Sequence, residues 1–169
     1  MAAAVNDFYI TPLLVTLRSA CRHLSAGWGL EVFILGYQIS DEGRRRVETS
    51  LRALPVRVRW QTLDLDAVRP YWPGIHNEGD VTAYYRLFLG EALPATVTRV
   101  LFLDADLLIE GDLAALWNLP FDAHVAQAVP DAYARQLHVA RLSRVSFTED
   151  IQFSTDTPYF NAGVILIDL

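Results

Sequence analysis

Residues 99–106 of this chain read Arg-Val-Leu-Phe-Leu-Asp-Ala-Asp, an unbroken apolar run that ends in two carboxylates one residue apart. A short apolar run without alternation is typical of a strand that is buried on both faces, as in parallel sheets covered by helices on both sides. In an open sheet of this kind, ligands bind beyond the carboxyl ends of the strands. We therefore expect Asp104 and Asp106 to lie at the edge of the sheet where a ligand binds.

The D-x-D pattern by itself leaves two interpretations open. Two aspartates after a strand are often only a solvated turn. Alternatively, a bend at Ala105 lets both carboxylates point at one hard cation. Oxygen ligands at such a point suit Mg²⁺ or Mn²⁺ carrying a phosphorylated substrate.

Strands that alternate with helices along the chain predict an α/β fold with a mostly parallel sheet. The length of 169 residues suits one domain, residues 1–169, and the apolar share of 52% is enough for a real core. We expect strands at 2–5, 30–35, 56–60, 99–103, 124–129 and 164–167. We expect helices from Thr11 to about residue 24, from Ser40 to Pro55, from Asp80 to about Gly90, and from Asp112 onward. The strand that ends at Leu103 should be central and parallel to the first two strands, because its apolar run needs cover on both faces.

Charge and composition argue against several classes of function. The net charge of −6 argues against a general nucleic-acid or membrane-surface binder, although a bound cation could still recruit an anionic substrate. No apolar run reaches the roughly 18 residues of a membrane-spanning helix, and the N-terminus lacks the basic region of a signal peptide. The single cysteine, Cys21, allows no internal disulfide, which is typical of a reducing compartment. We expect a cytoplasmic protein with no nucleic-acid partner.

Four stretches carry a likeness to a known family. They are residues 3–9 (Ala-Ala-Val-Asn-Asp-Phe-Tyr), 82–87 (Thr-Ala-Tyr-Tyr-Arg-Leu), 100–106 (Val-Leu-Phe-Leu-Asp-Ala-Asp) and 159–164 (Tyr-Phe-Asn-Ala-Gly-Val). In this order they resemble the nucleotide-sugar-binding part of family 8 glycosyltransferases, the retaining group that includes glycogenin and bacterial lipopolysaccharide galactosyl- and glucosyltransferases. The resemblance covers essentially the whole chain, and the last two stretches together are its specific part. It implies a GT-A fold, a Rossmann-like, mostly parallel sheet flanked by helices, which binds a UDP-sugar with a divalent cation, usually Mn²⁺.

The resemblance also implies roles for individual residues. Asp104 and Asp106 would be the metal ligands, with the metal bridging the diphosphate of the donor. Arg86 would reach the diphosphate or the donor sugar, because the guanidinium fork matches phosphate oxygens. The other residues placed at the nucleotide-sugar site are Val5, Asn6, Asp7, Tyr9, Ala105, Asn161, Ala162 and Gly163. Without the resemblance, Arg86 could be a surface ion pair, Tyr9 a core aromatic, and residues 161–163 a turn before a strand.

Two features depart from the family pattern. Asn6 stands where family members carry an acid expected to recognise the uracil edge, so an interaction there lacks charge assistance. Family members also continue past residue 169, with an acid–glutamine pair, a histidine of the metal site and a glycine–lysine segment that holds the diphosphate. We therefore expect a fragment whose last strand leaves apolar surface exposed, which binds donor weakly and shows little or no turnover alone. Any peripheral membrane association would come from the missing C-terminus.

The reaction implied is the metal-dependent transfer of a hexose from a UDP-sugar to a hydroxyl acceptor, with retention of the anomeric configuration. We assign no nucleophile. A same-face mechanism, with the UDP phosphate as base, would leave positioning and electrostatics to the protein. Three alternatives are a non-catalytic remnant that binds a sugar nucleotide, a nucleotidyltransferase, and an ATPase. Residues 1–12 lack the glycine-rich basic loop of a nucleotidyltransferase, and the chain has no G-x-x-x-x-G-K-[ST] loop of an ATPase.

Overall fold

The computed structural model describes residues 1–63, 81–133 and 157–169. Its strands are β1 (Ala2–Asn6), β2 (Leu30–Tyr37), β3 (Val56–Gln61), β4 (Arg99–Leu103), β5 (Ala126–Pro130) and β6 (Phe160–Asp168). Its helices are α1 (Ile10–His23), α2 (Asp41–Leu51), α4 (Val81–Tyr84), α5 (Leu89–Ala92) and α6 (Leu113–Trp117), with short 3-10 helices η1 (Asp7–Tyr9) and η4 (Tyr85–Phe88). No helix in these described ranges is long and apolar enough to cross a membrane.

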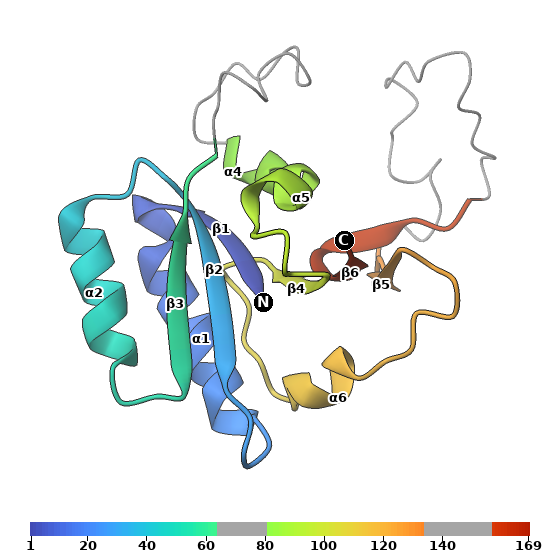
Figure 1. Ribbon diagram of the computed structural model, residues 1–169, viewed down its shortest axis with the longest axis horizontal. Helices are drawn as coiled ribbons and strands as arrows, with labels where there is room; N and C mark the ends of the chain where they lie inside the picture. Colours follow the sequence, from blue (N-terminus) through green and yellow to red (C-terminus); the bar gives the residue numbers. More distant parts are fainter. Residues whose placement is uncertain (64–80, 134–156) are drawn as a thin grey trace.

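The strands form one mixed sheet in the order β3-β2-β1-β4-β6-β5 (Figure 1). β1 lies between β2 and β4 and is parallel to both, with Ala2 paired to Phe33 on one side and to Phe102 on the other. The next strand, β6, is antiparallel to both β4 and β5. The prediction that the strand ending at Leu103 is central and parallel to the first two strands is therefore confirmed. The chain leaves β1 and β4 at the same edge of the sheet.

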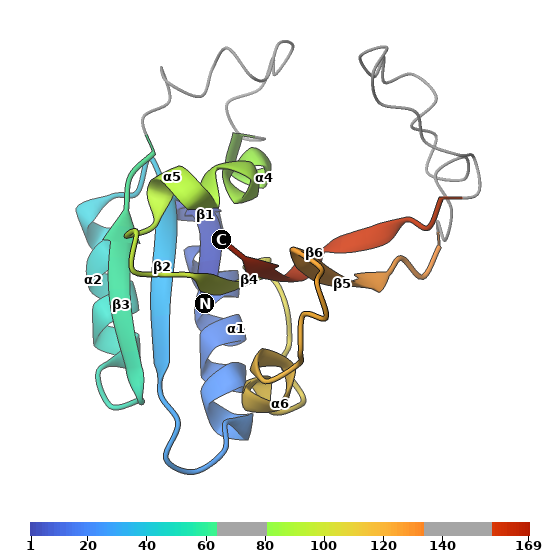
Figure 2. The same ribbon diagram turned by 45° about the vertical axis from the view of Figure 1, so that its right-hand side comes forward.

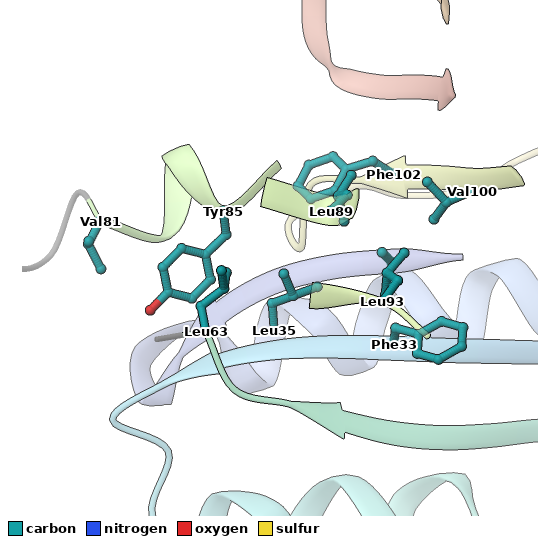
Figure 3. Close-up of a cluster of buried hydrophobic side chains, with 10 residues drawn as sticks. Phe33, Leu35, Leu63, Val81, Tyr85, Leu89, Leu93, Val100 and Phe102 are labelled. Atoms are coloured by element: carbon teal, nitrogen blue, oxygen red, sulfur yellow. The ribbon is translucent and has the colours of Figure 1, made fainter. Parts of the chain in front are cut away.

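Helices cover both faces of the sheet, where its apolar side chains lie. Helices α1 and α2 pack on one face of β1, β2 and β3, and the segment from α4 to α5 packs on the other face (Figures 1 and 2). Val100 and Phe102 of β4 point into the cluster under α4 and α5, which Figure 3 draws around Tyr85. Leu101 and Leu103 point the opposite way, toward α6. Each side chain buried this way contributes about 1.5–3 kcal/mol, so β4 is held from both faces.

Two of the predicted helices differ in detail from the structure. The first helix begins at Ile10 rather than after a Thr11 cap, because η1 runs directly into α1 and Tyr9 takes the cap position without a side-chain hydrogen bond. The helix expected from Asp80 to Gly90 is broken into α4, η4 and α5, and Asp80 itself lies outside the described residues.

The expected exposure of the last strand is wrong for its middle residues, although Phe160 at its start is 47% exposed. Leu166 is 1% exposed and Ile165 is 9% exposed. The reason is topological: β6 lies inside the sheet between β4 and β5, and its Leu166 joins the apolar cluster of α6. In both ribbon views, β5 and β6 extend away from the other strands (Figures 1 and 2).

Candidate functional site

A cleft of about 210 Å³ lies at the edge of the sheet where β1 and β4 end. Its lining consists of Ala4, Tyr9, Thr82, Ala83, Arg86, Phe102, Asp104, Ala105 and Asp106. A larger cavity of about 290 Å³ lies at the opposite ends of β1, β2 and β4, but apolar side chains dominate it and Glu31 is its single carboxylate. The cleft with paired carboxylates is therefore the stronger candidate, and it lies at the strand ends where open sheets bind ligands.

Arg86 joins three of the four sequence stretches at this cleft. Its Nη2 donates to Oδ1 of Asp104 at 2.9 Å, and its Nη1 donates to the carbonyl oxygen of Ala162. Its Nε donates to the carbonyl oxygen of Ala83 at 2.9 Å, and its guanidinium carbon lies 4.7 Å from the ring centre of Phe102. The Arg86 side chain is only 17% exposed, so it is built into the cleft rather than a surface ion pair.

The two aspartates have different surroundings. Burial raises the pKa of Asp104 above its ordinary value, the Arg86 guanidinium acts in the opposite direction, and Asp106 raises the pKa again. The ionised form of Asp104 is thus disfavoured by partial burial, and a nearby cation would relieve that penalty. Asp106 is exposed and makes no hydrogen bond or ion pair within the described ranges.

The Asn-Ala-Gly segment lies within β6 instead of forming a turn before it. The amide of Asp104 donates to the carbonyl of Gly163 at 2.8 Å, and the amide of Gly163 donates to Oδ1 of Asn161 at 2.8 Å. A Cβ atom on Gly163 would lie 2.8 Å from Oδ2 of Asp104 and 2.9 Å from Oδ1 of Asn161. The absence of a side chain at Gly163 therefore lets the side chains of Asn161 and Asp104 both lie close to the Gly163 backbone.

Replacing Gly163 with alanine is expected to destabilise the chain by about 1–3 kcal/mol, because the added methyl group must displace Asp104 or Asn161. Gly111→Ala is the matched control, since a Cβ atom there meets nothing within 4 Å. Denaturant unfolding followed by circular dichroism measures both variants. Equal stability of the two variants would show that the close approach at Gly163 is unimportant.

The structure places the residues of the first sequence stretch in different surroundings. Tyr9 lines the cleft and is 44% exposed, so it is not a core aromatic. The Val5 side chain is fully buried beneath α1. Asn6 caps η1 by accepting from the amide of Phe8, and Asp7 accepts from the amide of Ser40 at the start of α2. The structure thus brings together Tyr9, Arg86 and residues 104–106, with the backbone of 161–163 beside them, while residues 5–7 are not among those that line the cleft.

Sequence reasoning missed Thr16 of α1, whose hydroxyl lies against the backbone of Ala105 and Leu107. The available signal was a polar residue on the helix face that buries Leu13 and Leu17. It was overlooked because a single threonine in an apolar stripe is common.

The donor set of the cleft fits a hard divalent cation. Both carboxylates line the cleft, and one of them is exposed without a partner in the described part of the chain. No group of three or more histidine, cysteine, aspartate or glutamate side chains that could hold a metal occurs among those residues. Asp104 and Asp106 would therefore hold Mg²⁺ or Mn²⁺ from one side, with further oxygen ligands supplied from elsewhere.

Comparison with known proteins gives consistent matches. A model of the family described as Glycosyl transferase family 8 matches residues 1–169. The chain is 27% identical over 131 residues to Glycosyltransferase GlyF of Streptococcus pneumoniae, covering 78% of this chain and 31% of GlyF. It is 37% identical over 86 residues to lipopolysaccharide 1,2-glucosyltransferase of Escherichia coli, covering 51% of this chain and 23% of that protein.

Among solved structures, the galactosyltransferase LgtC in complex with donor and acceptor sugar analogues superposes with a TM-score of 0.76 at 25% identity. The superposition covers 99% of this chain and 56% of LgtC. The chain therefore spans less than a third of these two curated relatives and just over half of LgtC.

Proposed function

The chain belongs to glycosyl transferase family 8, and from this membership we propose that residues 1–169 form a nucleotide-sugar-binding unit whose cleft takes a UDP-sugar with a divalent cation. In the whole protein, this unit would serve the transfer of a hexose to a hydroxyl group of a saccharide or other acceptor, with retention of configuration. Mn²⁺ or Mg²⁺ is the proposed cation, held by Asp104 and Asp106.

One observation carries this proposal: the guanidinium of Arg86 bridges the Asp104 carboxylate and the Ala162 carbonyl. Three segments that are distant in sequence thereby converge on one cleft, with a cationic fork beside two carboxylates. A diphosphate needs positive charge and planar donors, which a cation and an arginine supply together. The LgtC complex with donor and acceptor sugar analogues, on the same fold, supports a sugar-bearing ligand.

The side chains of the cleft have separate tasks in this proposal. A cation bound by the two aspartates would supply positive charge against the charge that develops on the departing UDP. Arg86 orients the Asp104 carboxylate and offers its guanidinium to the diphosphate oxygens. The side-chain oxygen of Asn161 already accepts from the Gly163 amide, so its NH₂ group is left to donate to a sugar hydroxyl. In a same-face mechanism the protein would contribute positioning and electrostatics, with the UDP phosphate as the base.

UDP is expected to bind the chain at least about a hundredfold more tightly with Mn²⁺ than with EDTA, because a bound cation offsets the diphosphate charge. Isothermal titration calorimetry of the chain with UDP, in Mn²⁺ and in EDTA, measures this ratio. Titration with Mn²⁺ alone serves as the control for binding that does not depend on the nucleotide. An affinity for UDP that is the same in Mn²⁺ and in EDTA would contradict the proposal.

A further inference from the structure

Thr16 is an exception in the packing of α1. It is 0% exposed and is the only buried polar or charged residue in the part of the chain that the structure describes. Its neighbours on the same helix face, Leu13 and Leu17, are apolar and pack against the sheet. A buried hydroxyl must find hydrogen-bond partners, because an unsatisfied one is costly.

The partners of Thr16 are backbone groups on both sides of Asp106. The Thr16 Oγ1 atom lies 2.8 Å from the carbonyl oxygen of Ala105 and 2.7 Å from that of Leu107, and it accepts from the Leu107 amide at 3.0 Å. A hydroxyl carries one proton, so Thr16 accepts from Leu107 and donates to one of the two carbonyls. The Thr16 hydroxyl thus lies against the backbone on both sides of Asp106 and is hydrogen-bonded to the Leu107 amide, while its single proton goes to the carbonyl of Ala105 or of Leu107.

A second hydroxyl repeats this arrangement one helical turn further along. Ser19 Oγ accepts from the amide of Ile109 at 3.0 Å and donates to the carbonyl of Thr16 at 2.9 Å. Its contact lies three residues beyond Asp106. Ser19 therefore holds the backbone at Ile109, beyond the turn at Ala105–Leu107 that carries Asp106, whereas Thr16 holds that turn itself.

We propose that Thr16 is a positioning residue for the cation site, because its buried hydroxyl fixes the backbone turn that presents Asp106 beside Asp104. This inference rests on the proposed function. The 14 residues of α1 pack on the sheet and provide a rigid reference for the turn. Without that hydroxyl, backbone groups of Ala105–Leu107 lose a hydrogen-bond partner and the turn relaxes. Two carboxylates that are held loosely bind a cation less well than two that are held in place.

Three variants test this inference: Thr16→Val, which keeps the shape and removes the hydroxyl, Thr16→Ser, which keeps the hydroxyl, and Ser19→Ala as the matched control. Hydrogen exchange followed by NMR reports on the Leu107 and Ile109 amides without any metal. Calorimetry with UDP and Mn²⁺ reports on the cation site. Thermal unfolding identifies any variant that fails to fold, and Thr16→Ala, which leaves room for a water molecule, then replaces Thr16→Val.

In Thr16→Val, the Leu107 amide is expected to exchange about tenfold faster, and UDP with Mn²⁺ to bind about tenfold more weakly, as the loss of one buried hydrogen bond predicts. Thr16→Ser is expected to restore both quantities. Ser19→Ala is expected to speed exchange at Ile109 while leaving the affinity for UDP with Mn²⁺ close to that of the unmodified chain.

The possible failures are distinguishable. If the unmodified chain does not bind UDP with Mn²⁺, the proposed function fails and this inference fails with it. If the unmodified chain binds but Thr16→Val binds equally well, only the inference fails, and Thr16 has a purely structural role. The inference also fails if Ser19→Ala weakens binding as much as Thr16→Val does, because the effect would then belong to the loop as a whole.

Discussion

Asp106→Ala is expected to weaken Mn²⁺-dependent binding of UDP by roughly a hundredfold, while leaving the melting temperature of the chain unchanged. Removing even an outer partner of a metal ligand costs about 10–100-fold in affinity, and removing a ligand should reach at least the upper end of that range. The fold is expected to survive because Asp106 is exposed and has no hydrogen-bond partner in the described residues. Affinity is measured by calorimetry and stability by thermal unfolding.

Glu110→Ala is the matched control for Asp106→Ala. Glu110 is an exposed carboxylate on the same loop, and it lies outside the cleft. If the site depends on Asp106 itself, the control keeps the affinity of the unmodified chain. A similar loss in both variants would mean that the charge of the loop, rather than a cation site, governs binding. No loss in Asp106→Ala would rule out Asp106 as a ligand.

Arg86→Ala is expected to lower the free energy of unfolding by about 1.5–3 kcal/mol, the usual value of a hydrogen bond to a charged group. The substitution leaves the half-buried Asp104 carboxylate without its cationic partner and frees the Ala162 carbonyl. It also removes the hydrogen bond that joins η4 to β6. Binding of UDP with Mn²⁺ should fall about tenfold or more, because the cleft loses its fixed positive charge. Chemical denaturation and calorimetry measure the two effects.

An exposed ion pair gives the comparison for Arg86. Arg45 contacts Glu42 at 3.0 Å, but the side chains of that pair are 69% and 68% exposed. Arg45→Ala is therefore expected to change stability by less than about 0.5 kcal/mol, since exposed pairs are screened by water. Arg86→Lys keeps the charge but not the fork, and is expected to lie between these two variants. If Arg86→Ala is as stable as Arg45→Ala, Arg86 does not hold the segments together.

The sequence predicted the structure best where burial determines the pattern of apolar residues. The apolar run at 100–103 predicted a strand covered on both faces, and both faces of β4 are covered. The position of the two aspartates at a strand end followed from the same run. The start of α2 was also predictable, because Ser40 is followed by two acids, and its hydroxyl accepts from the Gly43 amide.

The remaining features depend on contacts between residues that are distant in sequence. The side chains of Asn6 and Asp7 accept from the amides of Phe8 and Ser40, and the second contact spans 33 residues, so the local sequence does not predict it. The place of β6 between β4 and β5 was not predictable either, because strand order is a property of the sheet and not of any one segment. For the same reason the local sequence does not predict the contact of Thr16 with the Ala105 carbonyl, which spans 89 residues.

The order of strands has a consequence for how the chain acquires its binding cleft. β1 pairs with β4, which follows it by almost a hundred residues, and β4 pairs with β6, which begins more than 50 residues after β4 ends. Contacts of such long sequence separation form slowly, because loop closure must precede them. On a ribosome, the Ala162 carbonyl would emerge long after Arg86, its partner across 76 residues. The cleft is therefore completed only after β6 has been made, and a nucleotide that binds it selects chains whose β6 has already entered the sheet.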